Sequence, residues 1–460
     1  MNRTLNLRAI RAVGFDMDYT LVHYRVEEWE RRAYEHARAH LAARGWPVQD
    51  LRFDAELVTV GLVLDLELGN LIKATRFGYV TRAEHGTREL TFEQQRQAYS
   101  RVLVDLREPR WLFLNTLFSL SEATLFSQCV DLLDAGKLDP TLGYAGLYRV
   151  VKSAVDATHM EGALKAEIAE NPGPFVELDP DLPRTLLDLK EAGKLLLLVT
   201  NSEWSYTRAI LSYALDPALP GGMSFRELFD LVVVAARKPE FFTGHSALFE
   251  IVDDSGLLRP ALGPMRRGGL YLGGNARSVE QDLGLAAEEI LYVGDHLYAD
   301  VHVTKDMLRW RTALILREME REVKSSLQFR PAQDELNRLM AQKVALEHRT
   351  SLARLELQRG EHGAGDPEAA RARLTEIRAQ VVELDQRIAP LADAAGRVGN
   401  PHWGLLMRAG LDKSYLARQV ERYADIYTSR VSNFSLCSPH AYLRAPRVTL
   451  PHDPDAGWSP

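Results

Sequence analysis

Five short apolar runs constrain the fold of this chain more than any other feature of its sequence. They are AVGFDMD (12–18), KLLLLVTNS (194–202), LVVVAARKP (231–239), ILYVGDHLYAD (290–300) and TALILRE (312–318). Leu, Val and Ile in a row, without polar alternation, are typical of strands buried on both faces of a parallel sheet; segments of buried helix are the alternative. Helical patterns lie between the runs, at 183–194 and 278–289, so the sequence predicts a doubly wound α/β fold.

The spacing of the runs predicts an inserted domain. About 180 residues separate Asp18 from Thr200, whereas a crossover between parallel strands needs only a dozen or more. Residues 25–182 are therefore predicted to form a cap after the first strand. Its patterns at 26–45 and 118–136 have helical spacing, so we expect it to be mostly helical, with short strands around 50–82.

The composition changes after the last of these strands. Two Leu-, Ala-, Arg- and Glu-rich patterns, at 334–360 and 367–396, are separated by EHGAGD, and they predict a helical hairpin arm at 326–399. A structural arm or an oligomer contact is the expected use of such a hairpin. Residues 400–450 are expected to return to the core, with another helix within 404–434. The catalytic core then combines 1–24, 183–325 and 400–450, and 451–460 forms a loose tail.

Charge and composition exclude several classes of protein. The formal net charge is −7, which does not favour nucleic acid or an anionic membrane as a partner. The N-terminus lacks the apolar segment of a signal peptide, and no apolar run reaches the length that spans a bilayer. Two cysteines cannot build a disulfide framework. We therefore expect a soluble, cytoplasmic protein.

Asp16 and Asp18 stand one residue apart at the end of the first apolar run. On an extended segment two such side chains point the same way, and two close carboxylates repel unless a cation lies between them. A hard divalent cation such as Mg²⁺ is the natural partner for oxygen ligands. The pair therefore predicts a metal site, although a lone D-x-D is more often a turn or a solvated pair.

The other runs end in residues that suit the same chemistry. Asp295 and Asp300 offer further carboxylates, Lys238 offers a fixed positive charge, and the TNS segment (200–202) offers hydroxyl, amide and backbone N–H donors. In an open α/β sheet such residues meet beyond the carboxyl ends of the strands. Together they predict phosphoryl transfer, because its transition state spreads negative charge over oxygens that cations and donors stabilise.

DMDYT, TNS, RKP and GDHLYAD resemble the four motifs of the haloacid dehalogenase superfamily of phosphatases. A narrower resemblance, to the IMP/GMP-preferring cytosolic purine 5′-nucleotidase family, extends from about residue 8 to 453. It rests on GFDMDYTL (14–21), LGNLIK (68–73), LNTLF (114–118), TNS, ARKPEFF (236–242), YLGGNA (271–276), ILYVGDHLYAD and QVERYADIYTSR (419–430). The resemblance implies a haloacid dehalogenase-like core and hydrolysis of nucleoside monophosphates.

The resemblance also implies a function for each motif residue. Asp16 would be the nucleophile and Asp18 the general acid and base. Mg²⁺ would be held by the Asp16 carboxylate, the Asp18 carbonyl and Asp295, with Asp300 in support. The residues that would hold the phosphate are Thr200, Asn201, Ser202 and Lys238.

The same resemblance implies two nucleotide sites. Phe118 would stack on the purine, and VKSAVDATHMEGALK (151–165) would supply Lys152, Asp156, His159 and Lys165, unless it is an ordinary amphipathic helix. Lys152 and Met160 depart from the family, which usually has arginine and often tyrosine there; lysine cannot make the planar bidentate contact of arginine. The residues that resemble the family's nucleotide effector site are Asn115, Gln419, Arg422 and Tyr423, for which packing alone is the alternative.

The sequence thus predicts an Mg²⁺-dependent purine 5′-nucleotidase that forms an aspartyl phosphate and also transfers phosphate to a nucleoside. A phosphatase of another phosphomonoester, such as a sugar phosphate, would use the same motifs with a different cap. A nucleotide-binding regulatory protein on a silent phosphatase fold is a third hypothesis, which the presence of Asp16, Asp18, Lys238 and Asp295 argues against. The family pattern and the arm favour a homo-oligomer, a dimer or tetramer.

Overall fold

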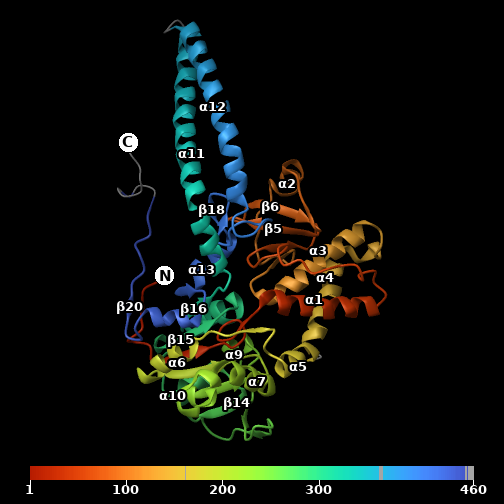
Figure 1. Ribbon diagram of the computed structural model, residues 1–460, viewed down its shortest axis with the longest axis vertical. Helices are drawn as coiled ribbons and strands as arrows, with labels where there is room; N and C mark the ends of the chain where they lie inside the picture. The colour runs from red at the N-terminus through yellow and green to blue at the C-terminus, as the bar shows by residue number, and fades with distance from the viewer. Residues whose placement is uncertain (161, 362–365, 451–452, 454–460) are drawn as a thin grey trace.

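A nine-stranded sheet forms the centre of the computed structural model (Figure 1). The structure describes residues 1–160, 162–361, 366–450 and 453, without the side chains of residues 159, 160 and 361. The strands of the sheet, in spatial order, are β13 (Leu258–Pro260), β12 (Leu248–Ile251), β14 (Gly269–Gly273), β11 (Leu231–Val234), β10 (Leu195–Val199), β2 (Ala12–Phe15), β15 (Ile290–Gly294), β16 (Arg311–Ile315) and β19 (Ile426–Thr428). From β14 to β19 all neighbours are parallel, which confirms the predicted doubly wound α/β class.

Alternate residues of the central strands pack into two apolar cores, one on each face of the sheet. Phe15 and Leu198 belong to one core, and Leu197 and Tyr292 belong to the other. Helices cover both faces: α6 (Leu182–Glu191) and α7 (Trp204–Leu215) bury apolar residues in the first core, α9 (Glu240–Thr243) and α10 (Ala276–Leu283) in the second. Burial on both faces explains why the strand sequences show no polar alternation.

The region inserted after β2 combines α-helices with a second, smaller sheet. Four of the helices are α1 (Val26–Ala43), α3 (Leu120–Asp134), α4 (Gly143–Met160) and α5 (Ala163–Glu170). The sheet is antiparallel, in the order β7 (Arg88–Glu89), β6 (Val80–His85), β5 (Asn70–Ala74), β4 (Val63–Asp65) and β8 (Trp111–Phe113), with α2 (Phe92–Tyr99) beside it. Strands were expected only around 50–82, so β7, β8 and the later β9 (Val176–Glu177) are additions to the predicted cap.

Two short strands join the inserted region to the core. β3 (His23–Tyr24) leads into it and β9 (Val176–Glu177) leads out, and the two pair antiparallel. Arg317 and Arg430 of the core both hold Glu177 through ion pairs. The entry and exit of the insertion are therefore fixed side by side next to the carboxyl ends of the central strands.

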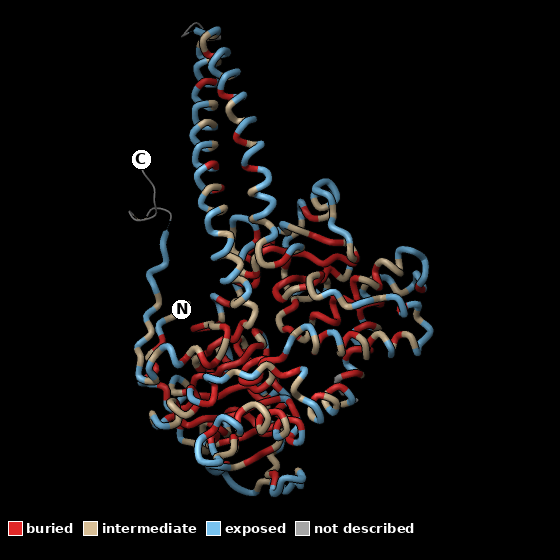
Figure 2. Tube along the Cα trace, in the orientation of Figure 1, coloured by how far each residue is buried: buried red, intermediate tan, exposed pale blue. Residues whose placement is uncertain are grey.

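A helical hairpin projects from the molecule, as predicted for 326–399 (Figure 1). Helix α11 (Met319–Glu361) begins seven residues earlier than expected, and α12 (Pro367–Gly396) returns beside it. Leu336, Leu339, Leu384 and Ile388 fill the seam between the two helices. Figure 2 shows most of the remaining arm surface exposed, in contrast to the buried strands of the core.

The segment after the arm contains more than the single helix expected within 404–434. Helix α13 (Tyr415–Tyr423) is short. The carboxylate of Asp425, just after it, accepts hydrogen bonds from the side chains of Lys305 and Arg311 and from the backbone N–H of Thr312. The chain then adds β19 to the edge of the large sheet, and β20 (Tyr442–Leu443) pairs with β1 (Leu5–Asn6). Between arm and α13, β17 (Arg408–Ala409) and β18 (Asp412–Lys413) form a hairpin. The predicted tail, 451–460, lies outside the described residues apart from Asp453.

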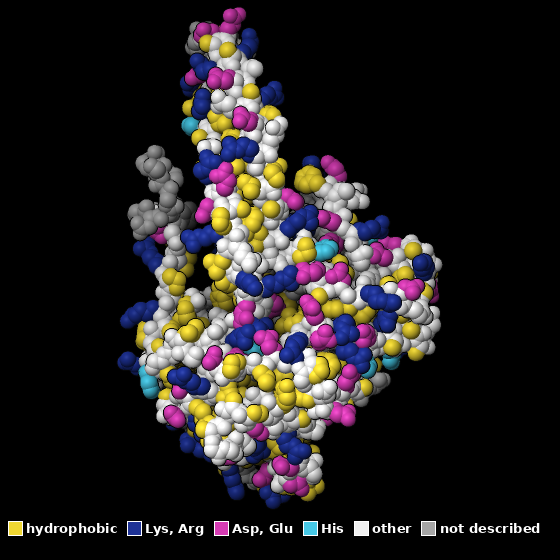
Figure 3. Space-filling model, viewed as in Figure 1, with side chains coloured by type: hydrophobic (Ala, Val, Ile, Leu, Met, Phe, Trp, Pro, Cys, Tyr) yellow, Lys and Arg dark blue, Asp and Glu magenta, His cyan; other side chains and the backbone are white. Residues whose placement is uncertain are grey.

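Surface charge is mixed rather than segregated. On the face shown in Figure 3, basic and acidic side chains alternate over the core, the insertion and the arm. Among the described helices, none combines the length and the apolar character needed to cross a bilayer.

Candidate active site

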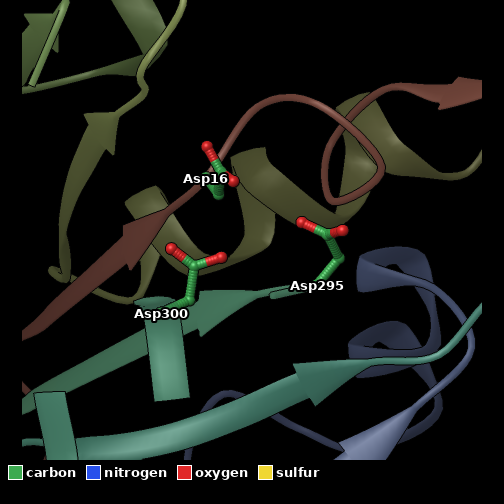
Figure 4. Close-up of side chains that lie close together, drawn as sticks. All are labelled: Asp16, Asp295 and Asp300. Atoms are coloured by element: carbon green, nitrogen blue, oxygen red, sulfur yellow. The ribbon is translucent and has the colours of Figure 1, made fainter. Parts of the chain in front are cut away.

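The residues that the sequence predicts for phosphoryl transfer meet at one edge of the large sheet. Strands β11, β10, β2 and β15 are neighbours and parallel, so the loops after them open at the same edge. The chain continues from β2 to one side through β10, β11 and β14, and then crosses to β15 on the other side. Such a topological switch point is where open α/β sheets bind ligands. In Figure 4, Asp16 follows β2, Asp295 follows β15, and Asp300 faces both from the helical turn after it.

The backbone after β2 turns sharply to present its two aspartates. Tyr19 has a φ of 55°, a left-handed conformation that costs a non-glycine residue about 1–2 kcal/mol. In return, the N–H groups of Leu21 and Val22 both donate to the carbonyl of Met17, at 3.0 and 2.9 Å. This tight loop ends the strand and keeps Asp16 and Asp18 at the carboxyl edge of the sheet.

Lys238 lies between two carboxylates. Its Nζ is 2.8 Å from Oδ1 of Asp16 and 2.8 Å from Oδ1 of Asp300, and its side chain is 3% exposed. The N–H of Met17 also donates to the Asp16 carboxylate, at 2.7 Å. Burial nevertheless raises the pKa of Asp16 to about 7, against the lowering effect of Lys238. One ammonium therefore does not offset the buried negative charge of this site.

The donor set fits a magnesium ion. Asp16, Asp295 and Asp300 each place a carboxylate oxygen within 4.8 Å of the others, and oxygen ligands are what Mg²⁺ requires. Burial, followed by the charges of Asp16 and Asp300, raises the pKa of Asp295 well above its usual value. A divalent cation among these carboxylates would compensate the negative charge that Lys238 does not neutralise.

Asp300 differs from the other two carboxylates in its partners. One oxygen binds Lys238, and the other accepts the backbone N–H of His296, at 3.1 Å. Asp300 is fully buried, whereas the carboxylate of Asp295, among the residues that the structure describes, accepts one hydrogen bond, from the Thr116 hydroxyl at 3.4 Å. This arrangement favours Asp16 and Asp295 as ligands and Asp300 as support for Lys238 and for the turn after β15.

Gly294 allows Asp300 to lie this close to the strand. A Cβ at position 294 would lie 2.5 Å from the Cβ and Cγ of Asp300, far inside van der Waals contact. We expect Gly294→Ala to displace Asp300 from Lys238 and to lower kcat for phosphate release by about tenfold or more, because small displacements at a reacting centre are costly. Gly263→Ala, where a Cβ meets nothing within 4 Å, is the control. Wild-type kcat in Gly294→Ala would contradict the supporting function of Asp300.

The TNS segment fixes the loops around Lys238 and Asp18. The Asn201 side chain donates to the carbonyl of Lys238 at 3.1 Å and accepts its N–H at 2.5 Å. The buried hydroxyl of Thr200 accepts the N–H of Ser202, at 3.0 Å. Ser202 in turn donates to Oδ2 of Asp18, at 2.6 Å. Phosphate binding by these residues stays a prediction; the contacts present are with the loops after β11 and β2.

Asp18 has partners that the sequence did not indicate. Tyr24 donates to its Oδ1 at 2.5 Å, and the hydroxyl of Tyr206 lies 2.9 Å from that of Tyr24. Lys165, expected at the substrate, donates to Ser202 at 3.1 Å. Tyr24 follows Asp18 by six residues in the sequence, but nothing in that spacing reveals that the chain turns back.

Of the predicted base-binding residues, Phe118 lies in the 3-10 turn Leu117–Ser119 just before α3, and Lys152, Asp156 and His159 lie on α4. Phe118 packs edge-on against Tyr19, with ring centroids 4.7 Å apart. Lys152 pairs with Asp156 at 3.1 Å and with Glu122 at 3.7 Å. The predicted His159 lies in α4, but its side chain is outside the described residues.

Glu122 is a residue that sequence reasoning missed at this site. Its side chain is 10% exposed, and it accepts the hydroxyl of Tyr148, at 2.5 Å. It follows Phe118 by four residues, the spacing that places two side chains on one face of a helix, so this signal was present in the sequence.

The four predicted effector residues share a cavity. Asn115, Gln419, Arg422 and Tyr423 line a space of about 800 Å³ between the inserted sheet, α13 and the turn after β15, together with Arg107 and Arg418. Asn115 also lines a small adjoining cavity with Asp295. The two predicted sites are therefore neighbours.

Comparison with known proteins identifies the family of this chain. The family model described as the 5′ nucleotidase family matches residues 1–455. The chain belongs to the 5′-nucleotidase family. The predicted family is thus confirmed, and this membership makes the chain a phosphoric monoester hydrolase by class.

Two relatives illustrate how far the similarity extends. The human 5′-nucleotidase domain-containing protein 1 is 30% identical over 352 residues, which cover 69% of this chain and 74% of that protein. A 5′-nucleotidase domain-containing protein of Dictyostelium discoideum is 27% identical over 465 residues, which cover 98% of this chain and 74% of that protein. A solved archaeal β-phosphoglucomutase from Pyrococcus sp. strain ST 04 overlaps more loosely, with 12% identity, a TM-score of 0.31 and coverage of 66% of this chain and 86% of that one.

Proposed function

We propose that this 5′-nucleotidase family member is an Mg²⁺-dependent, cytoplasmic nucleotidase that hydrolyses purine nucleoside 5′-monophosphates of the IMP/GMP type. The observation that carries the proposal is Lys238 bridging Asp16 and Asp300 at 2.8 Å each, at the edge of the sheet where Asp18 and Asp295 also lie. A buried carboxylate with a fixed ammonium, a metal-ligand set and a second carboxylate are the parts that phosphoryl transfer through an aspartyl phosphate requires.

The reaction would proceed in two displacements on the phosphorus. An oxygen of Asp16 bonds to phosphorus while the bond to the ribose 5′-oxygen breaks, and Asp18 gives its proton to that oxygen. Water then bonds to the phosphorus and passes a proton to the Asp18 carboxylate, while the bond to Asp16 breaks and releases phosphate. Lys238 neutralises charge near the transferring group, and Mg²⁺, when bound, adds positive charge at the non-bridging oxygens. A nucleoside hydroxyl in place of water would make the enzyme a phosphotransferase.

Asp295 offers the most direct test of the metal. We expect the isosteric Asp295→Asn to raise the Mg²⁺ concentration for half-maximal rate by at least about tenfold, since a charged ligand is lost. Titration calorimetry with Mg²⁺ alone gives a second readout. Asp254→Asn, at a side chain that is 84% exposed, controls for surface charge. An unchanged Mg²⁺ requirement would exclude Asp295 as a ligand.

The residues predicted to bind the base suit a purine without fixing which one. They combine the aromatic ring of Phe118, which packs edge-on against Tyr19, with the polar groups of Glu122, Lys152 and Asp156. The ammonium group of Lys152 already pairs with the carboxylates of Glu122 and Asp156. An arginine at this position would instead offer a planar guanidinium group that can make two parallel hydrogen bonds. A phosphatase for another phosphomonoester is the second candidate, and this departure at Lys152 is the observation that favours it.

Phosphate release from a substrate panel separates these candidates. The panel contains IMP, GMP, AMP, UMP, dGMP, a sugar phosphate and p-nitrophenyl phosphate, each with Mg²⁺ and with or without ATP. A kcat/KM preference of tenfold or more for IMP or GMP, about 1.4 kcal/mol of discrimination, would support the purine pocket. Preference for the sugar phosphate would support phosphomonoester hydrolysis and contradict the proposed purine pocket. Absence of activity would favour a regulatory nucleotide-binding protein.

The cavity around Arg422 and Tyr423 supports a nucleotide effector site. Its three arginines suit phosphates and its aromatic rings suit a base, while Asn115 connects it to the wall beside Asp295. The ATP arm of the panel tests this site, and Arg422→Ala should remove any activation that the wild type shows. The proposed homo-oligomer, a dimer or tetramer, is tested separately by light scattering.

A further inference from the structure

The carboxyl group of Asp18 is held by two hydroxyl groups, one on each oxygen. Tyr24 donates to Oδ1 at 2.5 Å and Ser202 donates to Oδ2 at 2.6 Å. Both donors are buried, at 2% and 1% exposure. A carboxyl group on a short side chain can rotate about two torsions, and donors on both oxygens fix the plane in which it lies.

A further donor lies behind each hydroxyl. Tyr24 has a single hydroxyl proton, which Asp18 receives, so Tyr206, 2.9 Å away, must donate to Tyr24. On the other side Lys165 donates to Ser202 at 3.1 Å. Lys165 also lies 5.0 Å above the centre of the Tyr206 ring, so the two chains of donors meet. Four side chains thus enclose one carboxyl group.

These four side chains come from the inserted region with its entry strand and from the core. Tyr24 lies on β3, the strand that enters the insertion, and Lys165 lies on α5 within it. Ser202 and Tyr206 belong to the loop after β10 and to α7 of the core. The orientation of Asp18 therefore depends on the insertion and the core being held as they are here.

We propose that Tyr24 and Tyr206 are positioning residues that hold the Asp18 carboxyl group in the orientation from which it protonates the leaving oxygen of a phosphomonoester. The inference rests on the proposed function and adds to it a determinant of the acid step. In that step the proton of Asp18 passes to the leaving oxygen as the bond from that oxygen to phosphorus breaks, and the phosphoryl group remains on Asp16. Proton transfer of this kind requires the acid within hydrogen-bond reach of the leaving oxygen.

The dependence on the leaving group tests this inference. An alkyl phosphate such as a nucleoside monophosphate needs a proton on its poor leaving group, whereas p-nitrophenyl phosphate does not. We expect Tyr24→Phe to lower kcat/KM for the best nucleotide by at least about tenfold and to change kcat/KM for p-nitrophenyl phosphate less than threefold. The quotient kcat/KM is chosen because it reports the steps up to transfer onto Asp16 and not the later attack of water. Tyr206→Phe should shift the same ratio in the same direction by a smaller factor.

Tyr99→Phe is the matched control. Tyr99 is also a buried tyrosine that donates to an aspartate, Asp65, at 3.0 Å, and accepts a second donor, Asn70, at 2.7 Å, but it lies on α2, beside the inserted sheet. Its removal should leave the ratio of the two substrates unchanged. Equal losses on both substrates in Tyr24→Phe and Tyr206→Phe, or a ratio equal to that of Tyr99→Phe, would overturn the inference while leaving the nucleotidase in place. A wild type that hydrolyses no phosphomonoester would overturn both.

Discussion

Asp16→Asn is expected to lower phosphate release by at least about a thousandfold, because an amide oxygen is a far weaker nucleophile than a carboxylate. The exchange keeps the shape of the side chain and an oxygen that can accept the Met17 N–H, now 2.7 Å from the carboxylate. Asp300 remains as a charged partner for Lys238. The fold should therefore survive, and far-UV circular dichroism and a thermal melt should resemble those of the wild type.

The phosphoenzyme provides the decisive measurement for Asp16. Rapid acid quench of the wild type with a radiolabelled substrate should trap label on the protein, and Asp16→Asn should trap none. Asp18→Asn keeps the nucleophile and should still accept label from p-nitrophenyl phosphate, which needs no acid. Label on Asp16→Asn, or a wild-type rate, would assign the nucleophile to another residue.

The large sheet could be predicted because its strands carry their own signal. Burial on both faces forces continuous apolar sequences on β2, β10, β11, β15 and β16, and all five were expected. The hairpin of β12 and β13 at the far edge was not, because Phe249 and its neighbours are partly exposed and show neither pattern strongly. Edge strands are specified by their neighbours more than by their own residues.

The convergence of the predicted site residues follows from the topology of the sheet. Neighbouring parallel strands bring the residues that follow them to one edge of the sheet. Asp16, Lys238 and Asp295 could therefore be placed together before any interatomic distance was known. The contact of Asp18 with Tyr24 could not be placed in this way. Ser202 also follows a strand, β10, that neighbours β2, whereas Tyr24 lies on β3, where the chain enters the insertion, so its bond to Asp18 depends on how the insertion joins the core.

The C-terminal segment shows where helical spacing misleads. Apolar and aromatic residues within 404–434 fit a helix, yet only Tyr415–Tyr423 form one. The carboxylate of Asp425 is fully buried and is bound by Lys305 and Arg311, and this tertiary contact ends the helix and starts β19. The pattern of the segment itself contains no sign of those partners, so tertiary context decided its structure.

Lys238→Met is expected to have the largest effect on stability of the substitutions considered. It removes the only positive charge that the described residues place within 4 Å of Asp16 and Asp300. Breaking a buried pair by removing one partner costs about 3–5 kcal/mol, because the remaining charge stays buried and uncompensated. Phosphate release should also fall by at least about a hundredfold, since a cation beside the transferring phosphoryl group is lost. Urea unfolding and steady-state kinetics measure the two effects.

Magnesium and a second buried lysine distinguish charge compensation from packing. If Lys238 offsets the charge of the site, Mg²⁺ should restore part of the lost stability in Lys238→Met, so that the loss is larger in EDTA than in excess Mg²⁺. Lys194→Met is the matched control: Lys194 is 5% exposed, and its Nζ donates to the carbonyls of Leu7 and Ile10, at 2.6 and 2.7 Å, rather than to a carboxylate. That variant should lose stability equally in both buffers and keep its kcat. Equal losses in EDTA and Mg²⁺ for Lys238→Met would mean that Lys238 supports packing and not the charge balance of a metal site.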